Sequence, residues 1–210
     1  MLEATLAQVV ESGFGNLSVE AVARRAGVHK TTVYRRWPDR ERLLTDALLE
    51  RSSQLVRVPD TGSVELDLVT LALDVVGNIT SAEGEAVLRT LVAEGGRLPE
   101  LSPMARSFWA ARFTLTGEVV NRAITKGELP QGTDAQLLLE CVVAPLYLRL
   151  LVTDEELSPD FVARVVKVVL AGCRQGGAAI HAAPHQARDR RLTCHRPAAS
   201  HRQPVATSNP

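Results

Sequence analysis

Seven basic residues lie between positions 24 and 42, where only two acidic residues oppose them. Arginine and lysine pair with phosphate oxygens, and arginine also forms two parallel hydrogen bonds with guanine. Residues 1–57 carry a formal charge of +2, residues 58–175 carry −6 and residues 176–210 carry +4, although the whole chain is neutral. A locally basic stretch on an acidic body is typical of a protein that binds duplex nucleic acid.

The basic stretch falls on short helices that a tight turn separates. Ser18 is a good N-cap, and the apolar residues after it recur at the i, i+3, i+4, i+7 spacing. Gly27 then ends this helix, because glycine readily adopts the left-handed conformation that closes many helices. A second helix of about residues 30–37 stops before Pro38, and Asp39 caps the next one. Two short helices joined by a tight turn, with a supporting helix on each side, predict a helix-turn-helix.

The helix at about residues 30–37 has one face that is free to reach DNA. At 100° per residue, Val33 and Trp37 fall on one side, which we expect to face the core. The opposite side carries hydroxyl and guanidinium groups, on Thr31, Thr32 and Arg35, with Tyr34 and Arg36 on the flanks. Such groups read base edges in the major groove. Lys30 and Arg40 lie at helix N-termini, where side-chain charge and free backbone N–H groups can hold phosphates.

The stretch Leu17 to Leu44 resembles the DNA-binding head of the tetracycline-repressor (TetR) family of bacterial regulators. The matching features are Ala26-Gly27-Val28, Thr32, Tyr34, the aromatic Trp37 and the basic Arg40 ahead of a leucine pair. The resemblance implies backbone contacts for Thr32 and Tyr34, phosphate contacts for Lys30 and Arg40, and base readout for Thr31 and Arg35. We therefore predict a DNA-binding site that consists of Ser18, His29, Lys30, Thr31, Thr32, Tyr34, Arg35, Arg36 and Arg40.

Two features depart from the family pattern. His29 stands where a serine usually caps the recognition helix, which leaves open a weaker cap or an added groove contact. The sequence also begins at the first predicted helix, without the basic arm that many members carry, so an arm contact with the minor groove stays open.

The remainder of the chain is also predicted to be helical, because it shows neither period-two alternation of apolar residues nor a hairpin signal. Start and stop signals place helices at about 64–81, 83–94, 102–127, 133–152 and 159–172. The clearest start signals are Ser102 and Ser158, each followed by a first-turn proline. We therefore expect an all-α fold, with a three-helix helix-turn-helix head at residues 1–57 and a larger helical regulatory and dimerisation domain at residues 58–175.

The resemblance continues beyond the head. Residues 144–153, followed by Phe161, are similar to the C-terminal regulatory domain of one subgroup of the family, which is common in high-GC actinobacteria. The likeness then covers about residues 1–175.

Residues 176–210 have almost no large apolar side chains, so burial could not offset the entropy of ordering them. We predict a disordered tail there. Its histidines and Cys194 match no zinc spacing, and we predict no metal site and no cofactor. The three cysteines of the chain are odd in number and widely spaced, which argues against a disulfide framework.

The two helices predicted at 133–152 and 159–172 are apolar nearly all round. A helix that is hydrophobic on every side needs partners on every side. Two interpretations follow, which are one large monomer core or a two-fold interface of four helices between two copies of the chain. We predict a homodimer, because a lone head contacts too few base pairs and because the family pairs these two helices.

A cluster of aromatic and polar residues in the helix at about 102–127, with one residue of the next helix, has the composition of a small-molecule pocket. These residues are Phe108, Trp109, Arg112, Phe113 and Thr116, together with Tyr147. The alternative is that they form ordinary core. We predict a site for an unidentified small-molecule effector at this cluster.

Other functional classes find little support. His29 is the only histidine outside residues 176–210, no glycine-rich phosphate loop occurs, and we predict no enzyme activity. The apolar run at 137–152 includes charged residues and a proline, so we predict a buried helix and no membrane contact. Glu3 lies where a signal sequence would be basic, which predicts a cytoplasmic protein.

The predicted function is a DNA-binding transcriptional regulator, a repressor that a small molecule releases from a palindromic operator in double-stranded DNA. The alternative is a protein-binding adaptor whose helix-turn-helix head lacks sequence-specific DNA binding.

Overall fold

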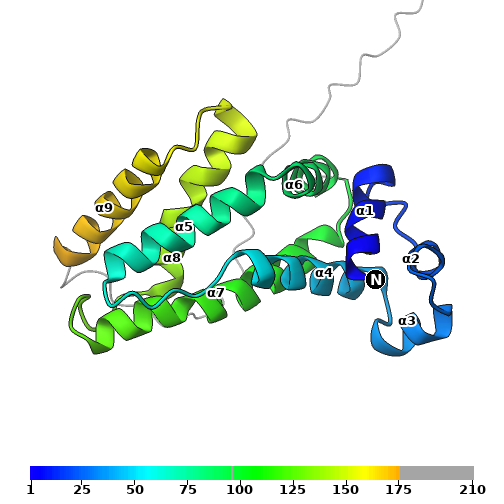
Figure 1. Cartoon of the computed structure of the whole chain (residues 1–210), viewed down its shortest axis with the longest axis horizontal. Helices are drawn as coiled ribbons and strands as arrows, with labels where there is room; N and C mark the ends of the chain where they lie inside the picture. Colours follow the sequence, from blue (N-terminus) through cyan, green and yellow to red (C-terminus); the bar gives the residue numbers. More distant parts are fainter. Residues whose placement is uncertain (96, 176–210) are drawn as a thin grey trace, which may run out of the picture.

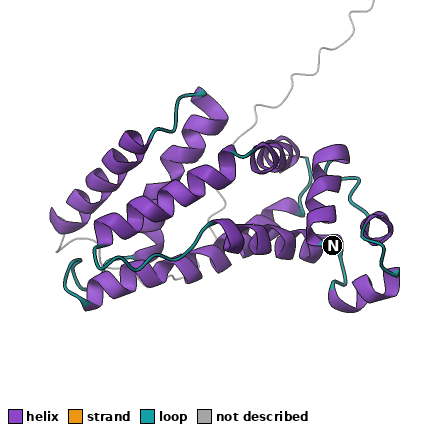
Figure 2. Ribbon diagram, in the orientation of Figure 1, coloured by secondary structure: helices purple, strands orange, loops and turns teal. Residues whose placement is uncertain are grey.

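The computed structural model describes residues 1–95 and 97–175, and this part of the chain is helical and contains no strand (Figure 2). The predicted all-α fold is therefore confirmed. The tail predicted at residues 176–210 lies outside the described residues.

The described residues contain nine α-helices and one π-helical turn, joined by short loops. In chain order they are α1 (Leu2–Ser12), α2 (Val19–Arg25), α3 (Lys30–Arg36), α4 (Arg40–Leu55), α5 (Val64–Thr80), α6 (Ala82–Gly95), α7 (Leu101–Thr125), α8 (Ala135–Leu148), the π-turn η1 (Arg149–Thr153) and α9 (Pro159–Gln175). Helices α1 to α3 form a head at one end of the molecule, and α9 lies at the other end (Figure 1). Helix α4 connects the head to the body, where it packs on α7.

Local signals in the sequence fix the ends of the head helices. The hydroxyl of Ser18 accepts a hydrogen bond from the Ala21 amide at 3.1 Å, which caps α2. Gly27 follows α2 with φ +67°, a conformation that costs glycine little. The carboxylate of Asp39 accepts from the Arg42 amide at 2.7 Å and caps α4. These are the caps and the turn that the sequence predicts.

The core of the head extends into the body. Phe14, Val33 and Trp37 are at most 2% exposed and pack with the other apolar side chains of α1 to α4. The same cluster includes Val87 from α6 and Met104 from α7. The head therefore does not close on itself, because two body helices complete its core.

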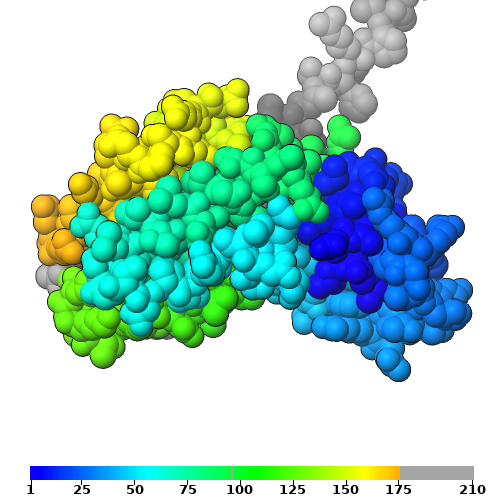
Figure 3. All heavy atoms as spheres, in the orientation of Figure 1, coloured from blue at the N-terminus to red at the C-terminus, as the bar shows by residue number. Residues whose placement is uncertain are grey.

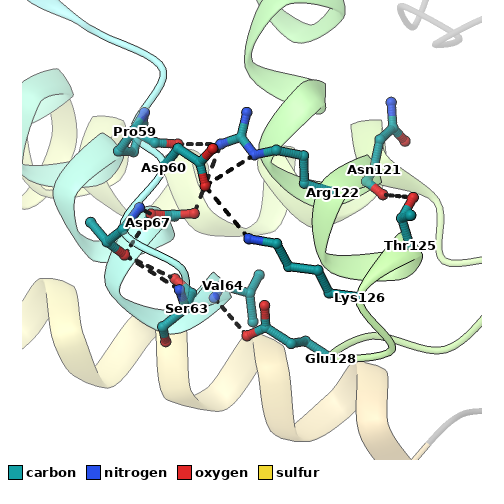
Figure 4. Close-up of polar contacts among 11 residues, drawn as sticks. Pro59, Asp60, Ser63, Val64, Asp67, Asn121, Arg122, Thr125, Lys126 and Glu128 are labelled. Carbon is teal, nitrogen blue, oxygen red and sulfur yellow. Dashed lines mark hydrogen bonds and ion pairs between the residues drawn. The ribbon is translucent and has the colours of Figure 1, made fainter.

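The connection between α4 and α5 is tied to the end of α7 by polar contacts (Figure 4). The carboxylate of Asp67 is buried and accepts from the backbone amide and the hydroxyl of Thr61, both at 2.7 Å. Asp60 lies 3.5 Å from the ammonium of Lys126 and 3.7 Å from the guanidinium of Arg122. This network fixes the start of α5 against the C-terminal end of α7.

Helix α8 lies within the body and packs on α5, α7 and α9. By length and composition alone, the run Ala135–Thr153 could cross a membrane, and 28% of its most apolar 18-residue window is buried inside the protein. The buried residues, which include Leu138, Val142 and Leu146, all belong to the body core. One face of the run is thus core, and the opposite face is exposed.

Three details of the predicted helices in the body are wrong. Helix α7 begins at Leu101, one residue before the predicted cap at Ser102, because Leu101 is 4% exposed and belongs to the head core. Helix α8 is capped by Asp134, which accepts from the Leu137 amide at 3.0 Å. The last turn of the helix predicted at 133–152 is the π-turn η1, which ends at Asp154 with φ +52°.

Candidate nucleic-acid interface and ligand cavity

The recognition helix α3 presents its polar side chains to solvent. Val33 is 0% exposed, and the predicted DNA-facing residues of the helix are all exposed, namely Lys30, Thr31, Thr32, Tyr34, Arg35 and Arg36. The head forms a lobe at one end of the molecule, coloured blue in Figure 3. Lys30 and Arg35 have no ion-pair partner among the described residues, so their charges are available to a ligand.

Tyr34 is held between α2 and α3 by a carboxylate. Its hydroxyl donates to Glu20 at 2.9 Å, and the Ser18 hydroxyl lies 3.3 Å from the same carboxylate. The hydrogen bond to Glu20 raises the pKa of Tyr34 from its ordinary value. The one hydroxyl proton of Tyr34 is thus donated to Glu20, at the edge of the recognition helix.

His29 occupies the N-cap position of α3 without capping it. Its side chain makes no hydrogen bond to the free amides of the helix. Nδ1 lies instead 2.9 Å from the hydroxyl of Thr31. The missing cap agrees with a weaker N-cap, and an added groove contact of His29 stays a prediction. The contact with Thr31 joins His29 to a predicted base-reading residue.

Arg40 is engaged within the protein. Its guanidinium donates to the Gly15 carbonyl at 2.8 Å and to the Glu100 carboxylate at 2.9 Å, and it lies 4.7 Å from the centre of the Phe14 ring. The predicted phosphate contact of Arg40 remains a prediction. Sequence reasoning missed these contacts, because Glu100 follows Arg40 by 60 residues.

A second link joins the same turn of the head to α6. The carboxylate of Glu94 accepts from the Phe14 amide at 2.6 Å. Gly13 has φ +80°, a conformation that favours glycine, and a Cβ atom there would displace the Glu94 carboxylate from its present position. The turn between α1 and α2 is thus fixed by Glu94 directly and by Glu100 through Arg40.

A cavity of about 230 Å³ lies between α4, α5, α6, α7 and α8. Apolar and aromatic side chains form most of its wall, and the lining residues are Leu48, Arg51, Ser52, Asn78, Ile79, Gly84, Val87, Leu88, Leu91, Val92, Met104, Ala105, Phe108, Trp109 and Tyr147. Val87 and Met104 also belong to the core of the head. The cavity therefore shares part of its wall with the DNA-binding head.

Three of the six residues predicted for the effector site line this cavity, and three do not. Trp109 lies between Phe108 and Tyr147, with ring centres 5.3 and 5.5 Å away in edge-to-face geometry. Phe113 stacks on the far side of Trp109 and packs into the body core. Arg112 and Thr116 are buried on α7 outside the lining. Arg112, Phe113 and Thr116 lie one to two helical turns beyond Phe108 and Trp109, and their part in the effector site stays a prediction.

Arg112 and Tyr147 influence each other electrostatically. Burial lowers the pKa of Arg112 from its ordinary value, and Tyr147 opposes that shift. Burial raises the pKa of Tyr147 to about 12, against the effect of the Arg112 guanidinium. Arg112 donates to the Val56 carbonyl at 3.4 Å and has no carboxylate partner among the described residues. At neutral pH the cavity wall therefore carries a neutral phenol.

The head, with its exposed polar recognition helix on a buried supporting face, defines a helix-turn-helix DNA-binding protein. The comparisons identify the family. Residues 1–47 match the model of bacterial regulatory proteins of the tetR family, and residues 58–169 match the tetracyclin repressor-like C-terminal domain. The chain belongs to the TetR family of transcriptional regulators. This family consists of regulators and not of enzymes.

Relatives match over most of their length. The transcriptional regulator AqdR of Rhodococcus erythropolis is 33% identical over 82% of this chain and 83% of its own. A protein named DNA-binding transcriptional repressor TetR, from Mycobacteroides abscessus, is 28% identical over 81% of this chain and 90% of its own. The crystal structure of the TetR family regulator SCO0332 is 30% identical, with a TM-score of 0.68 over 81% of this chain and 94% of that one. TetR-family regulators bind operator DNA and act as dimers.

Proposed function

We propose that this regulator is a repressor, which binds a palindromic operator as a homodimer and leaves it when a small molecule fills the body cavity. The observation that carries the proposal is the shared wall, since Val87 and Met104 both line the cavity and complete the head core. The name of the Mycobacteroides relative, which is a repressor, supports the direction of control. We also propose that the protein is located in the cytoplasm, where the chromosome lies.

Base readout is assigned to α3. Arg35 is exposed and unpaired among the described residues, which suits two hydrogen bonds to guanine. Thr31 adds a hydroxyl and a methyl group beside it. Lys30, Tyr34 and Arg36 contact the DNA backbone on either side, and Ser18 and His29 support them through the cap of α2 and the contact with Thr31.

The dimer interface is assigned to the exposed apolar stripes of α8 and α9. On α8 the stripe recurs every three or four residues and consists of Leu137, Cys141, Ala144 and Leu148, all exposed. Val152 of η1 continues it and is 72% exposed. On α9 the exposed Val168, also 72% exposed, follows the half-buried Phe161 and Val165 at the same spacing. Two such stripes on neighbouring helices suit a two-fold four-helix interface.

The dimer sets the spacing of the two heads. Two recognition helices reach successive major grooves only when they lie about 34–36 Å apart. A ligand that favours another spacing lowers DNA affinity by its differential affinity for the two states. Helix α6 supplies the route, because it lines the cavity and carries Glu94 in its last turn, where this residue holds the turn of the head.

Selection of bound duplexes from a random pool, followed by gel shift at several salt concentrations, tests the DNA part of the proposal. We expect a palindromic site, two chains per duplex, and an affinity that falls steeply with salt. Binding that falls with salt but shows no sequence preference would contradict the regulator and favour the adaptor interpretation.

A further inference from the structure

The cavity has one polar end within a mostly apolar wall. This inference rests on the proposed effector cavity and concerns the chemistry of its ligand. Arg51 of α4 is the only charged residue among the lining side chains, and Asn78 of α5 lies in the same wall. The remaining lining is dominated by aliphatic residues and by three aromatic rings, those of Phe108, Trp109 and Tyr147.

Two buried polar atoms of this end have no hydrogen-bond partner among the described residues. They are Nε of Arg51 and Oδ1 of Asn78. A buried donor or acceptor without a partner is unfavourable, because it has lost its hydrogen bonds to water. Both atoms have almost no accessible surface, so a ligand supplies the missing partners only when these two cavity-lining side chains rotate toward it.

The corner between α5 and α6 fixes the backbone of Asn78 and the guanidinium of Arg51. The Ser81 hydroxyl donates to the backbone carbonyl of Asn78 and accepts from the Arg51 guanidinium, each at 2.8 Å. A Cβ atom at Gly84 would overlap the Asn78 carbonyl, so the close approach of the two helices requires glycine there. The backbone of the polar end is thus preformed, which lowers part of the entropic cost of binding.

The charge balance of the polar end favours a neutral ligand. The Arg51 guanidinium already forms an ion pair with Glu83. An anionic ligand at Arg51 would bring a second negative charge close to Glu83, and a cationic ligand would face Arg51 without a free carboxylate in the lining.

The size of the cavity limits the ligand further. An apolar protein cavity of about 150 Å³ holds benzene. At about 230 Å³ this cavity accommodates a two-ring aromatic compound or a single ring with a short substituent. The edges and faces of Trp109 and Tyr147, which already pack in edge-to-face geometry, favour an aromatic body.

We propose that the cavity binds a small uncharged aromatic compound whose hydroxyl or carboxamide group accepts from Arg51 and donates to Asn78. A single hydroxyl both accepts and donates a hydrogen bond, so one group can partner both atoms. The aromatic body occupies the apolar part of the cavity beside Phe108 and Trp109.

Equilibrium dialysis of the full-length protein without DNA tests the proposal. Three naphthalene probes of similar shape are compared. These are 2-naphthol, 2-methylnaphthalene, which lacks the hydrogen-bonding group, and 2-naphthoate, which is charged. We expect 2-naphthol to bind at least tenfold more tightly than 2-naphthoate. Equal or tighter binding of 2-naphthoate, or no binding of 2-naphthol up to its solubility limit, overturns the proposal.

Asn78→Leu removes the acceptor and keeps the branched shape of the side chain, with two methyl groups in place of the carboxamide oxygen and nitrogen. We expect the affinity ratio of 2-naphthol to 2-methylnaphthalene to fall by about tenfold, the equivalent of one hydrogen bond to a buried group. Thr80→Val is the matched control, because Thr80 lies on the same helix, is exposed and does not line the cavity. An unchanged ratio in Asn78→Leu contradicts the proposed polar end.

The dialysis experiment and the operator-binding experiment can fail independently of each other. If the protein binds 2-naphthol as expected but binds no operator, the DNA proposal fails and the ligand inference holds. If operator binding is confirmed and 2-naphthoate binds as well as 2-naphthol, the ligand inference fails alone. The comparison of the two probes in the wild-type protein needs no variant and is independent of how well Asn78→Leu folds.

Discussion

Glu94 is the residue through which the body holds the head most directly. Its carboxylate accepts from the Phe14 amide at 2.6 Å, and the side chain of Phe14 is 0% exposed. Glu94→Ala removes the acceptor and leaves a partly buried amide without a partner. Because Glu94 lies in the last turn of α6, which lines the cavity, the same change weakens the proposed route from effector to head.

The expected cost follows from the hydrogen bond. A bond to a charged group contributes about 1.5–3 kcal/mol when buried, and partial exposure lowers this range. We expect Glu94→Ala to reduce the free energy of unfolding by about 1–2 kcal/mol. For a chain of this length that corresponds to a fall in Tm of about 2–8 °C.

Urea denaturation followed by tryptophan fluorescence measures this cost, because Trp37 is buried in the head and reports its unfolding. Glu94→Gln keeps an acceptor oxygen and is expected to lose less than half as much stability. Glu118→Ala is the control for removing an exposed acidic residue from a helix. If Glu94→Ala had the same midpoint as Glu118→Ala, the link between Glu94 and the head would contribute nothing, and our reasoning on this contact would be refuted.

Four further predictions follow from the structure. Arg35→Ala is expected to cost about 1–3 kcal/mol on the selected operator and to relax selectivity at one base position, which binding to single-base variants of the operator measures; unchanged selectivity would remove Arg35 from base readout. Arg40→Gln is expected to weaken binding to all sequences alike and also to lower Tm, because it breaks the contacts with Gly15 and Glu100; an unchanged Tm would contradict the second effect. Val168→Glu places a charge on the exposed stripe of α9 and is expected to give a monomer by sedimentation, whereas Lys167→Glu is expected to stay dimeric; a dimeric Val168→Glu protein would exclude this interface. Because the pKa of Tyr147 rises from about 10 to about 12 on folding, its contribution to stability is present below pH 10 and lost as pH rises toward 12; absorbance of the phenolate should therefore show Tyr147 protonated in the native protein at pH 10.5, and an ionised Tyr147 there would contradict its burial.

Some features of the head were predictable because their signals are local. Ser18, Gly27 and Asp39 act within three residues of their own positions, through caps and a left-handed turn. The buried face of α3 was predictable for the same reason, since helical geometry alone places Val33 and Trp37 together. These features do not depend on the rest of the chain.

Other features depend on which helices meet. The start of α7 is decided by the packing of Leu101 into the head, and this overrides the local start signal at Ser102. The cavity takes Arg51 and Asn78 from helices that the sequence does not bring together, so the aromatic cluster on α7 located only part of the wall. The contact of Glu94 with Phe14 spans 80 residues and has no local signal.

The central claim is that two copies of this chain bind one operator. Sedimentation of the protein with a palindromic duplex selected from a random pool tests it most directly, because the mass of the complex gives the number of chains. We predict two chains on one duplex, with half-sites about one helical turn or a multiple of it apart. A complex of one chain with one duplex, at protein concentrations that saturate the selected site, would contradict the account.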